Sequence, residues 1–182
     1  MAYLDGHLDL YDGLTSPTGE GADMPLSAAL GRGPAAWVEA CGGPSTRVED
    51  VVPIGYRDPD ELPTLAELKP ELGPGFRCVS KDEVQGEGPS AVGARVAREL
   101  AAGPGRYWLH LDVDILGEDV FPATDYLMPG GLEMREMVAL MRPFAVSPSL
   151  IGISLGCYNP EKDPGDVCAR ALVEAFAAAL AG

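Results

Sequence analysis

The sequence has little of what several protein classes need. Only 13 of its 182 residues are basic, against 28 acidic ones, which gives a formal charge of −15. Nucleic acids and anionic membranes repel such a surface, so neither is expected as a partner. The longest apolar stretch, near Ala171–Ala181, is interrupted by Glu174 and is too short to span a bilayer. The acidic balance suits the binding of cations, although bulk charge alone does not establish it.

Cysteine and histidine are also scarce. With only two histidines in the chain, a structural zinc site is not expected. No two cysteines have the CxxC spacing of a zinc-binding knuckle. The four cysteines are Cys41, Cys78, Cys157 and Cys168. Because no secretory signal pattern is present either, we expect reduced thiols and a cytoplasmic protein.

Strand-like segments alternate with helical ones along the chain. Apolar residues make up 46% of the sequence, so a core can form, and the length favours one domain over residues 1–182. The expected strands are Met1–Leu4, Val51–Gly55, Phe76–Ser80, Arg106–Ile115 and Leu150–Leu155. The expected helices are Leu26–Ala40 (broken by Gly31, Gly33 and Pro34), Leu62–Leu68, Ser90–Ala102, Leu132–Met141 and Asp166–Leu180. This alternation predicts an α/β fold with a mainly parallel sheet and helices on both of its faces.

Carboxylates and a histidine stand at the ends of two expected strands. Asp5, His7 and Asp9 occupy alternate positions after the first strand, and Asp112 and Asp114 repeat this spacing near the end of the fourth. Alternate residues of a strand share one face, and ligand sites of parallel α/β folds lie beyond the carboxyl ends of the strands. The five side chains can therefore converge on metal ions.

Each motif alone has a simpler interpretation. An isolated Asp-x-Asp is usually a solvated turn, and an isolated histidine near a strand is usually a core residue. The combination favours a metal site, because carboxylates next to a strongly apolar strand would be costly to bury without a partner. The mixed oxygen and nitrogen set suits manganese, iron or cobalt better than a zinc site built on thiolates. Four aspartates would also balance the charge of two divalent ions.

The two segments resemble the arginase, agmatinase and formiminoglutamase family, the ureohydrolases. The first family signature is a strand ending in Asp-Ala-His-x-Asp, which reads Asp5-Gly6-His7-Leu8-Asp9 here. The second is Asp-x-Asp followed by a proline-bearing loop and Pro-Gly-Gly-Leu, which matches Asp112-Val113-Asp114, Pro122 and Pro129-Gly130-Gly131-Leu132. Val51–Arg57 resembles the family's strand that ends in Gly-x-Arg, and Ile151–Pro160 its last strand, which ends in Asn-Pro. The resemblance implies a three-layer α/β/α sandwich.

The resemblance also implies a binuclear manganese centre. One ion would be held by Asp5, Asp9 and Asp112, and the other by Asp5, His7, Asp112 and Asp114, so that Asp5 and Asp112 bridge the two. A metal-bridging hydroxide, oriented by Asp9 as the catalytic residue, would attack the carbon of a linear amidine or guanidino substrate and break a C–N bond. The expected partners are a small-molecule substrate and further copies of the chain in a homo-oligomer.

The sequence departs from the family pattern in three places. No Gly-Gly-Asp-His segment precedes Asp5, so a histidine of the first ion and the opening strands of the sheet are missing. The simplest interpretation is a fragment, and a naturally short protein is the alternative. Ala22 stands where arginase-like members place a proton-shuttling histidine, and Cys157 stands where arginases and agmatinases place a glutamate that binds the guanidinium. These last two differences argue against arginine and agmatine as substrates but leave the metal chemistry in place.

Two other functions stay open. A non-catalytic or truncated member of the family would bind metal weakly. Another two-metal hydrolase, such as a phosphoesterase, is disfavoured because no arginine or lysine stands near either signature to hold phosphate. Among single residues, His110 has a simpler interpretation as a core residue or as one that supports the ligands, and Cys157 as a small buried apolar residue.

Overall fold

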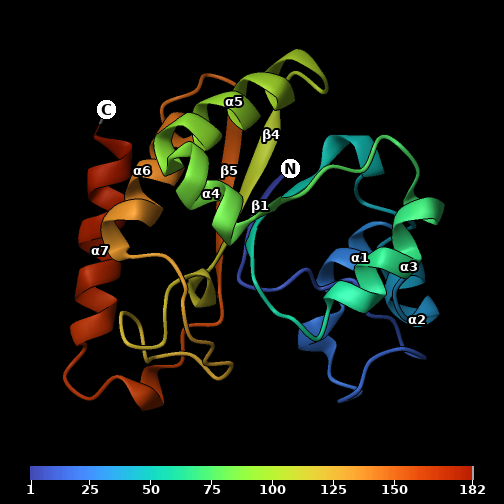
Figure 1. The fold of residues 1–182 in the computed structure, drawn as a ribbon, viewed down its shortest axis with the longest axis horizontal. Coiled ribbons are helices and arrows are strands. Elements are labelled where there is room, and N and C mark those ends of the chain that lie inside the picture. The colour runs from blue at the N-terminus through green and yellow to red at the C-terminus, as the bar shows by residue number, and fades with distance from the viewer. Residues whose placement is uncertain (182) are drawn as a thin grey trace. The chain divides into compact units, whose positions relative to one another are not determined.

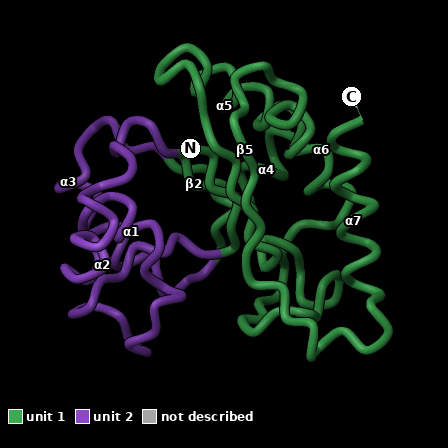
Figure 2. The backbone as a smooth tube through the Cα atoms, turned by 180° about the vertical axis from the view of Figure 1, so that it is seen from behind, with its two compact units in different colours: residues 1–6, 52–57, 78–182 green, residues 7–51, 58–77 purple. Residues whose placement is uncertain are grey.

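The computed structural model describes residues 1–181 and shows strands alternating with helices (Figure 1). The backbone forms two compact units, which Figure 2 draws in green and purple. Unit 1 contains Met1–Gly6, Val52–Arg57 and the chain from Cys78 onward. Unit 2 contains His7–Val51 and Asp58–Arg77. Each unit is therefore assembled from segments that are separate in the sequence.

A five-stranded parallel sheet forms the centre of unit 1, in the order β3-β2-β1-β4-β5. Its strands are β1 (Ala2–Leu4), β2 (Val52–Tyr56), β3 (Val79–Ser80), β4 (Tyr107–Asp112) and β5 (Leu150–Gly156). All five predicted strands are present. The predicted α/β class with a parallel sheet is confirmed.

One face of the sheet packs into the apolar core. Ala2 and Leu4 of β1 pair with Leu109 and Leu111 of β4, and all four residues are fully buried. Residues paired across parallel strands point to the same face, so these two strands present one continuous apolar surface. Its burial helps to hold the three-residue strand β1 in the middle of the sheet.

The helices of unit 1 pack on the sheet and on one another. They are α4 (Lys81–Glu87), α5 (Pro89–Ala102), α6 (Met134–Ala145) and α7 (Val167–Leu180), with the 3₁₀ turns η3 (Val113–Ile115) and η4 (Pro160–Lys162). Helix α5 contacts β1 and α6, and α6 contacts α7. The predicted helical spacing of α5 is confirmed, because its Val92, Val96 and Leu100 are all buried in the core.

Unit 2 consists of short helices and loops. It contains η1 (Gly21–Asp23), α1 (Pro25–Ala29), α2 (Ala35–Ala40), η2 (Val48–Asp50) and α3 (Leu62–Leu72). The break between α1 and α2 falls where the sequence predicts it. Gly31 in this break has a φ of 80°, a conformation that glycine adopts more easily than other residues. Across residues 1–181, no helix has both the length and the apolar character that a membrane span requires.

Among the elements that differ from the sequence-based expectation, three differ for a local reason. Helix α4 was not predicted; it begins with a capping box in which Ser80 and Glu83 bind each other's backbone N–H. Helix α3 continues past its predicted end at Leu68, because Leu72 is buried one turn later. Strand β4 ends at Asp112, three residues early, because the carboxylate of Asp112 accepts the N–H of Asp114 at 3.0 Å and starts the turn η3.

Candidate metal centre

Two rows of side chains lie on the sheet face opposite the apolar core. In the first row, His110 of β4 is paired with Tyr3 of β1 on one side and with Ser154 of β5 on the other. In the second, Asp112 is paired with Gly156 of β5. Asp5 follows Leu4 just as Asp112 follows Leu111, so Asp5 continues this second row on the β1 side. The strand register therefore brings carboxylates from two adjacent strands to one edge of the sheet.

Backbone hydrogen bonds orient two of these carboxylates. The Oδ1 atom of Asp112 accepts the N–H of Asp114 at 3.0 Å. The Oδ1 atom of Asp114 accepts the N–H of Gly6 at 3.0 Å. A side chain at Gly6 would collide with Asp114 and Arg57, so the missing side chain lets β1 approach the end of β4. Both aspartates are therefore held in fixed orientations by the strand ends themselves.

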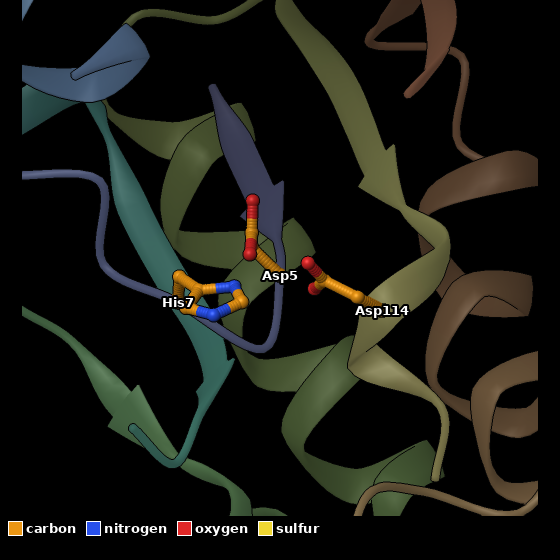
Figure 3. A group of neighbouring side chains, drawn as sticks. All are labelled: Asp5, His7 and Asp114. Carbon is orange, nitrogen blue, oxygen red and sulfur yellow. The ribbon is translucent and has the colours of Figure 1, made fainter. Parts of the chain in front are cut away.

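The structure brings four of the five predicted ligands into metal-compatible groups. Asp5, His7 and Asp114 each offer a ligand atom, and these atoms all lie within 4.8 Å of one another (Figure 3). A second group, with the same limit of 4.8 Å, consists of Asp5, Asp112 and a residue that was not predicted as a ligand, His110. Asp5 belongs to both groups. The fifth predicted ligand, Asp9, belongs to neither group within residues 1–181.

The donor set of these groups fits divalent cations. Asp5, Asp112 and Asp114 are at most 6% exposed. Burying several carboxylates close together is unfavourable, and bound cations would offset their mutual repulsion. Carboxylate oxygens combined with imidazole nitrogens are typical of manganese, iron and cobalt sites. The edge of the sheet can therefore hold two divalent ions that share Asp5.

His110 lies beside the carboxylates. Its ring stacks on the ring of Tyr3 with centroids 4.7 Å apart, and its Nδ1 lies 2.8 Å from the Oγ of Ser154. Loss of solvation lowers the pKa of His110, while the nearby charge of Asp114 acts in the opposite direction. The net effect favours the neutral imidazole, which is the form that binds metals.

Cys157 is close to the same carboxylates. It follows the edge strand β5 and is exposed as a residue, so its interpretation as a buried apolar residue is wrong. Loss of solvation around the sulfur, together with the charge of Asp112 next to it, raises the pKa of the Cys157 thiol. The backbone of Cys157 has a φ of 64°, an uncommon value for a residue with a side chain. A neutral thiol therefore stands at this position beside the site.

Arg57 corrects the expectation that no basic residue lies near the signatures. Its guanidinium donates to the backbone carbonyls of Asp114, Leu116 and Met128 at 2.9–3.1 Å and to that of Pro129 at 3.1 Å. The sequence did not reveal this, because Arg57 follows β2 and meets the other segments only through the strand order. These four bonds fix the loop after β4, so the guanidinium stabilises the backbone of this loop.

Glu61 is a second residue whose role the sequence did not reveal. It is 3% exposed, and its carboxylate accepts the backbone N–H groups of Leu8 and Asp9, the latter at 2.9 Å. Burial raises its pKa to about 7, while these hydrogen bonds and the nearby His7 act in the opposite direction. Asp9 has a φ of 54°, so Glu61 holds an uncommon backbone turn in place. Acidic residues just before a helix usually face solvent, so the sequence gives no sign that Glu61 is buried.

Replacing Glu61 with alanine is expected to lower the free energy of unfolding by about 2–4 kcal/mol, because two buried N–H groups lose their acceptor at about 1–3 kcal/mol each. Urea titration of the metal-free protein, followed by circular dichroism, measures the loss. Glu67→Ala, at an exposed position of helix α3, which begins directly after Glu61, is the matched control and should change stability by less than about 0.5 kcal/mol. Equal losses in the two variants would show that Glu61 does not stabilise the turn.

Sequence comparisons point to one family. The sequence pattern of the Arginase family matches residues 2–182. An arginase of Brevibacillus brevis is 30% identical over 171 residues, which cover 93% of this chain and 56% of that protein. A formimidoylglutamase of Halobacterium salinarum is 31% identical over 109 residues, which cover 59% of this chain and 35% of that protein.

The fold is similar to that of solved arginases. The arginase structure from Bacillus caldovelox matches with a TM-score of 0.87 and 27% sequence identity, covering 100% of this chain and 60% of that one. The chain spans about half the length of the curated arginases that it matches. The similarity extends over all the elements that carry the two ligand groups.

Proposed function

The chain belongs to the arginase family, and on this premise we propose that it is a manganese-dependent hydrolase that cleaves a C–N bond of a linear amidine or guanidino substrate. The observation that carries the proposal is the pair of ligand groups that share the buried Asp5. Family membership alone would also fit a chain that no longer binds metal. Two groups of ligand atoms within 4.8 Å support the active alternative.

The residues proposed to hold the ions are Asp5, His7, Asp9, Asp112 and Asp114. When bound, two divalent ions would supply a water-derived nucleophile at neutral pH. Asp5 is shared by both groups and is proposed to contact both ions. Asp9 is proposed as the catalytic residue that orients the nucleophile, and the bond from its N–H to Glu61 would fix its backbone. Asp114 would be kept in its orientation by Gly6.

The proposal is tested with the manganese-loaded chain and a panel of three substrates: arginine, agmatine and N-formimino-glutamate. Hydrolysis of at least one of them, abolished by a chelator and restored by manganese, is the expected result. The measured products are urea from arginine or agmatine, and formamide and glutamate from N-formimino-glutamate. A chain that holds manganese but hydrolyses none of the three would favour a non-catalytic member of the family.

Arginine is expected to be a poor substrate in this panel. The neutral thiol of Cys157 cannot pair with a guanidinium, and loss of a positioned acid typically costs about 10²–10⁴-fold in rate. Cys157→Glu should therefore raise kcat/KM for arginine. Cys41→Glu, the same charge change at an exposed cysteine of unit 2, is the control and should not. A normal arginase rate in the unmodified chain would contradict the expectation.

A further inference from the structure

We infer that His110 is a metal ligand of this chain and forms, with Asp5 and Asp112, the second of its two cation sites. The inference deepens the proposed function and rests on it. Each of the three residues offers a ligand atom within 4.8 Å of the others. All three lie in unit 1, on the adjacent strands β1 and β4 or directly at their ends. Parallel pairing of these strands is therefore sufficient to assemble the site.

The register of the sheet explains why the imidazole reaches the carboxylates. His110 and Asp112 are two residues apart in β4, so their side chains point to the same face. His110 pairs with Tyr3, and Asp5 lies two residues beyond Tyr3. The imidazole is thus one row behind the two carboxylates, on the side away from the strand ends. A cation between the two aspartates would meet the ring edge from that side.

Neighbouring side chains hold the His110 ring in a defined orientation. The Nδ1 atom lies 2.8 Å from the Oγ of Ser154, which also accepts the indole N–H of Trp108 at 2.9 Å. A hydroxyl oxygen has two lone pairs, so it can accept from both rings. With Nδ1–H donating to Ser154, the lone pair of Nε2 is available to a metal. Histidine ligands of metals usually have their other nitrogen fixed by such a bond.

Gly156 leaves open the space into which the ring and the carboxylate point. A Cβ atom built at Gly156 would lie 3.2 Å from Oδ2 of Asp112 and 3.8 Å from Nε2 of His110. These two atoms therefore border the same small volume above β5, which a residue with a side chain would narrow. The Oδ1 atom of Asp112 is engaged by the N–H of Asp114, which turns Oδ2 toward this volume.

The two histidines of the chain make the inference directly testable. Protein labelled with ¹⁵N only in histidine is loaded with Mn²⁺, and pulsed electron paramagnetic resonance detects nitrogen bound to the metal. We expect nitrogen coupling in the unmodified chain and in His7→Asn, where His110 is its only source. The double variant His7→Asn/His110→Asn should lose the coupling. Asparagine keeps a polar atom near the position of Nδ1, so the contact with Ser154 can persist.

Titration with Mn²⁺ gives a second readout. His110→Asn should weaken one of the two bound ions by more than about tenfold, since loss of a group that only supports a ligand already costs about 10–100-fold. Ser154→Ala retains the imidazole and should weaken the same ion by about tenfold. Ser90→Ala, at an exposed position of α5, is the matched control and should have no effect. Melting of each metal-free variant shows that it is folded.

The outcomes separate this inference from the proposed function. If His7→Asn binds Mn²⁺ without nitrogen coupling, and Ser154→Ala binds it as tightly as the unmodified chain, His110 is not a ligand, while the proposed function stands. If the unmodified chain binds no Mn²⁺, both are wrong. Coupling that survives in His7→Asn and disappears in the double variant supports His110 as the ligand.

Discussion

Asp112→Asn is expected to lower the affinity of the chain for Mn²⁺ by more than about 100-fold. Loss of a group that only supports a ligand costs about 10–100-fold, and the family resemblance implies that Asp112 itself bridges both ions. Asparagine keeps an oxygen that can accept the N–H of Asp114, so the turn η3 should survive. The substitution therefore removes the negative charge from the site with little change of shape.

Metal content by mass spectrometry and calorimetric titration measure this effect. Asp125→Asn is a matched control in unit 1, because Asp125 is exposed and binds Asn159 and Lys162 at 2.7–2.9 Å. This control should retain the affinity of the unmodified chain. Unchanged metal content in Asp112→Asn would rule out a bridging role for Asp112.

Arg57→Ala is expected to lower the free energy of unfolding by roughly 3–5 kcal/mol. Four backbone carbonyls of the loop after β4 lose their charged donor, and hydrogen bonds to charged groups contribute about 1.5–3 kcal/mol each without being additive. Arg57→Lys should recover part of the loss, because a single ammonium group cannot reproduce the planar fork of a guanidinium.

Urea titration of the metal-free variants measures the stability of each. Arg135→Ala, on an exposed position of α6, is the control and should stay within about 0.5 kcal/mol of the unmodified chain. If Arg57→Ala is as stable as this control, the four hydrogen bonds do not hold the loop. In that case, Arg57→Lys should also be as stable as the control.

The fold was largely accessible from sequence because its main elements are long or strongly patterned. The apolar run through Tyr107–Leu111 marks β4, and the spacing of Val92, Val96 and Leu100 marks α5. Strand β3 was expected over Phe76–Ser80 but has only two residues. A short edge strand has too few residues to show a clear hydrophobic pattern. Its length depends on how many residues of the neighbouring strand are available for pairing.

The candidate site was accessible in part. Asp5, His7, Asp112 and Asp114 were predicted as ligands because several carboxylates and a histidine at the ends of apolar strands are an unusual combination. His110 was not chosen as a ligand, since a histidine inside an apolar strand is more often a core residue. His110 is two positions before Asp112, just as Asp112 is two positions before Asp114. This regular spacing could have marked His110 as a candidate ligand.

The supporting residues of the site could not be predicted, for a different reason. Arg57 and Glu61 act on segments about 50 to 70 positions away in the sequence. Such contacts depend on strand order and on which acid of a charged run is buried. Neither property can be read from local spacing or composition. Candidate ligands are therefore easier to predict from sequence than the residues that hold them in place.

The pairing of β1 with β4 has a consequence for how the protein folds. Ala2 pairs with Leu109, so more than 100 residues must be made and brought back before these neighbours can meet. Contacts of such long range form slowly, since the entropy of closing the loop is lost before the contact is gained. Each ligand group combines residues from both of these strand ends: Asp5 directly after β1, and Asp112 or Asp114 at the end of β4. A chain emerging from the ribosome therefore carries its first acidic motif long before it has a site that can hold an ion.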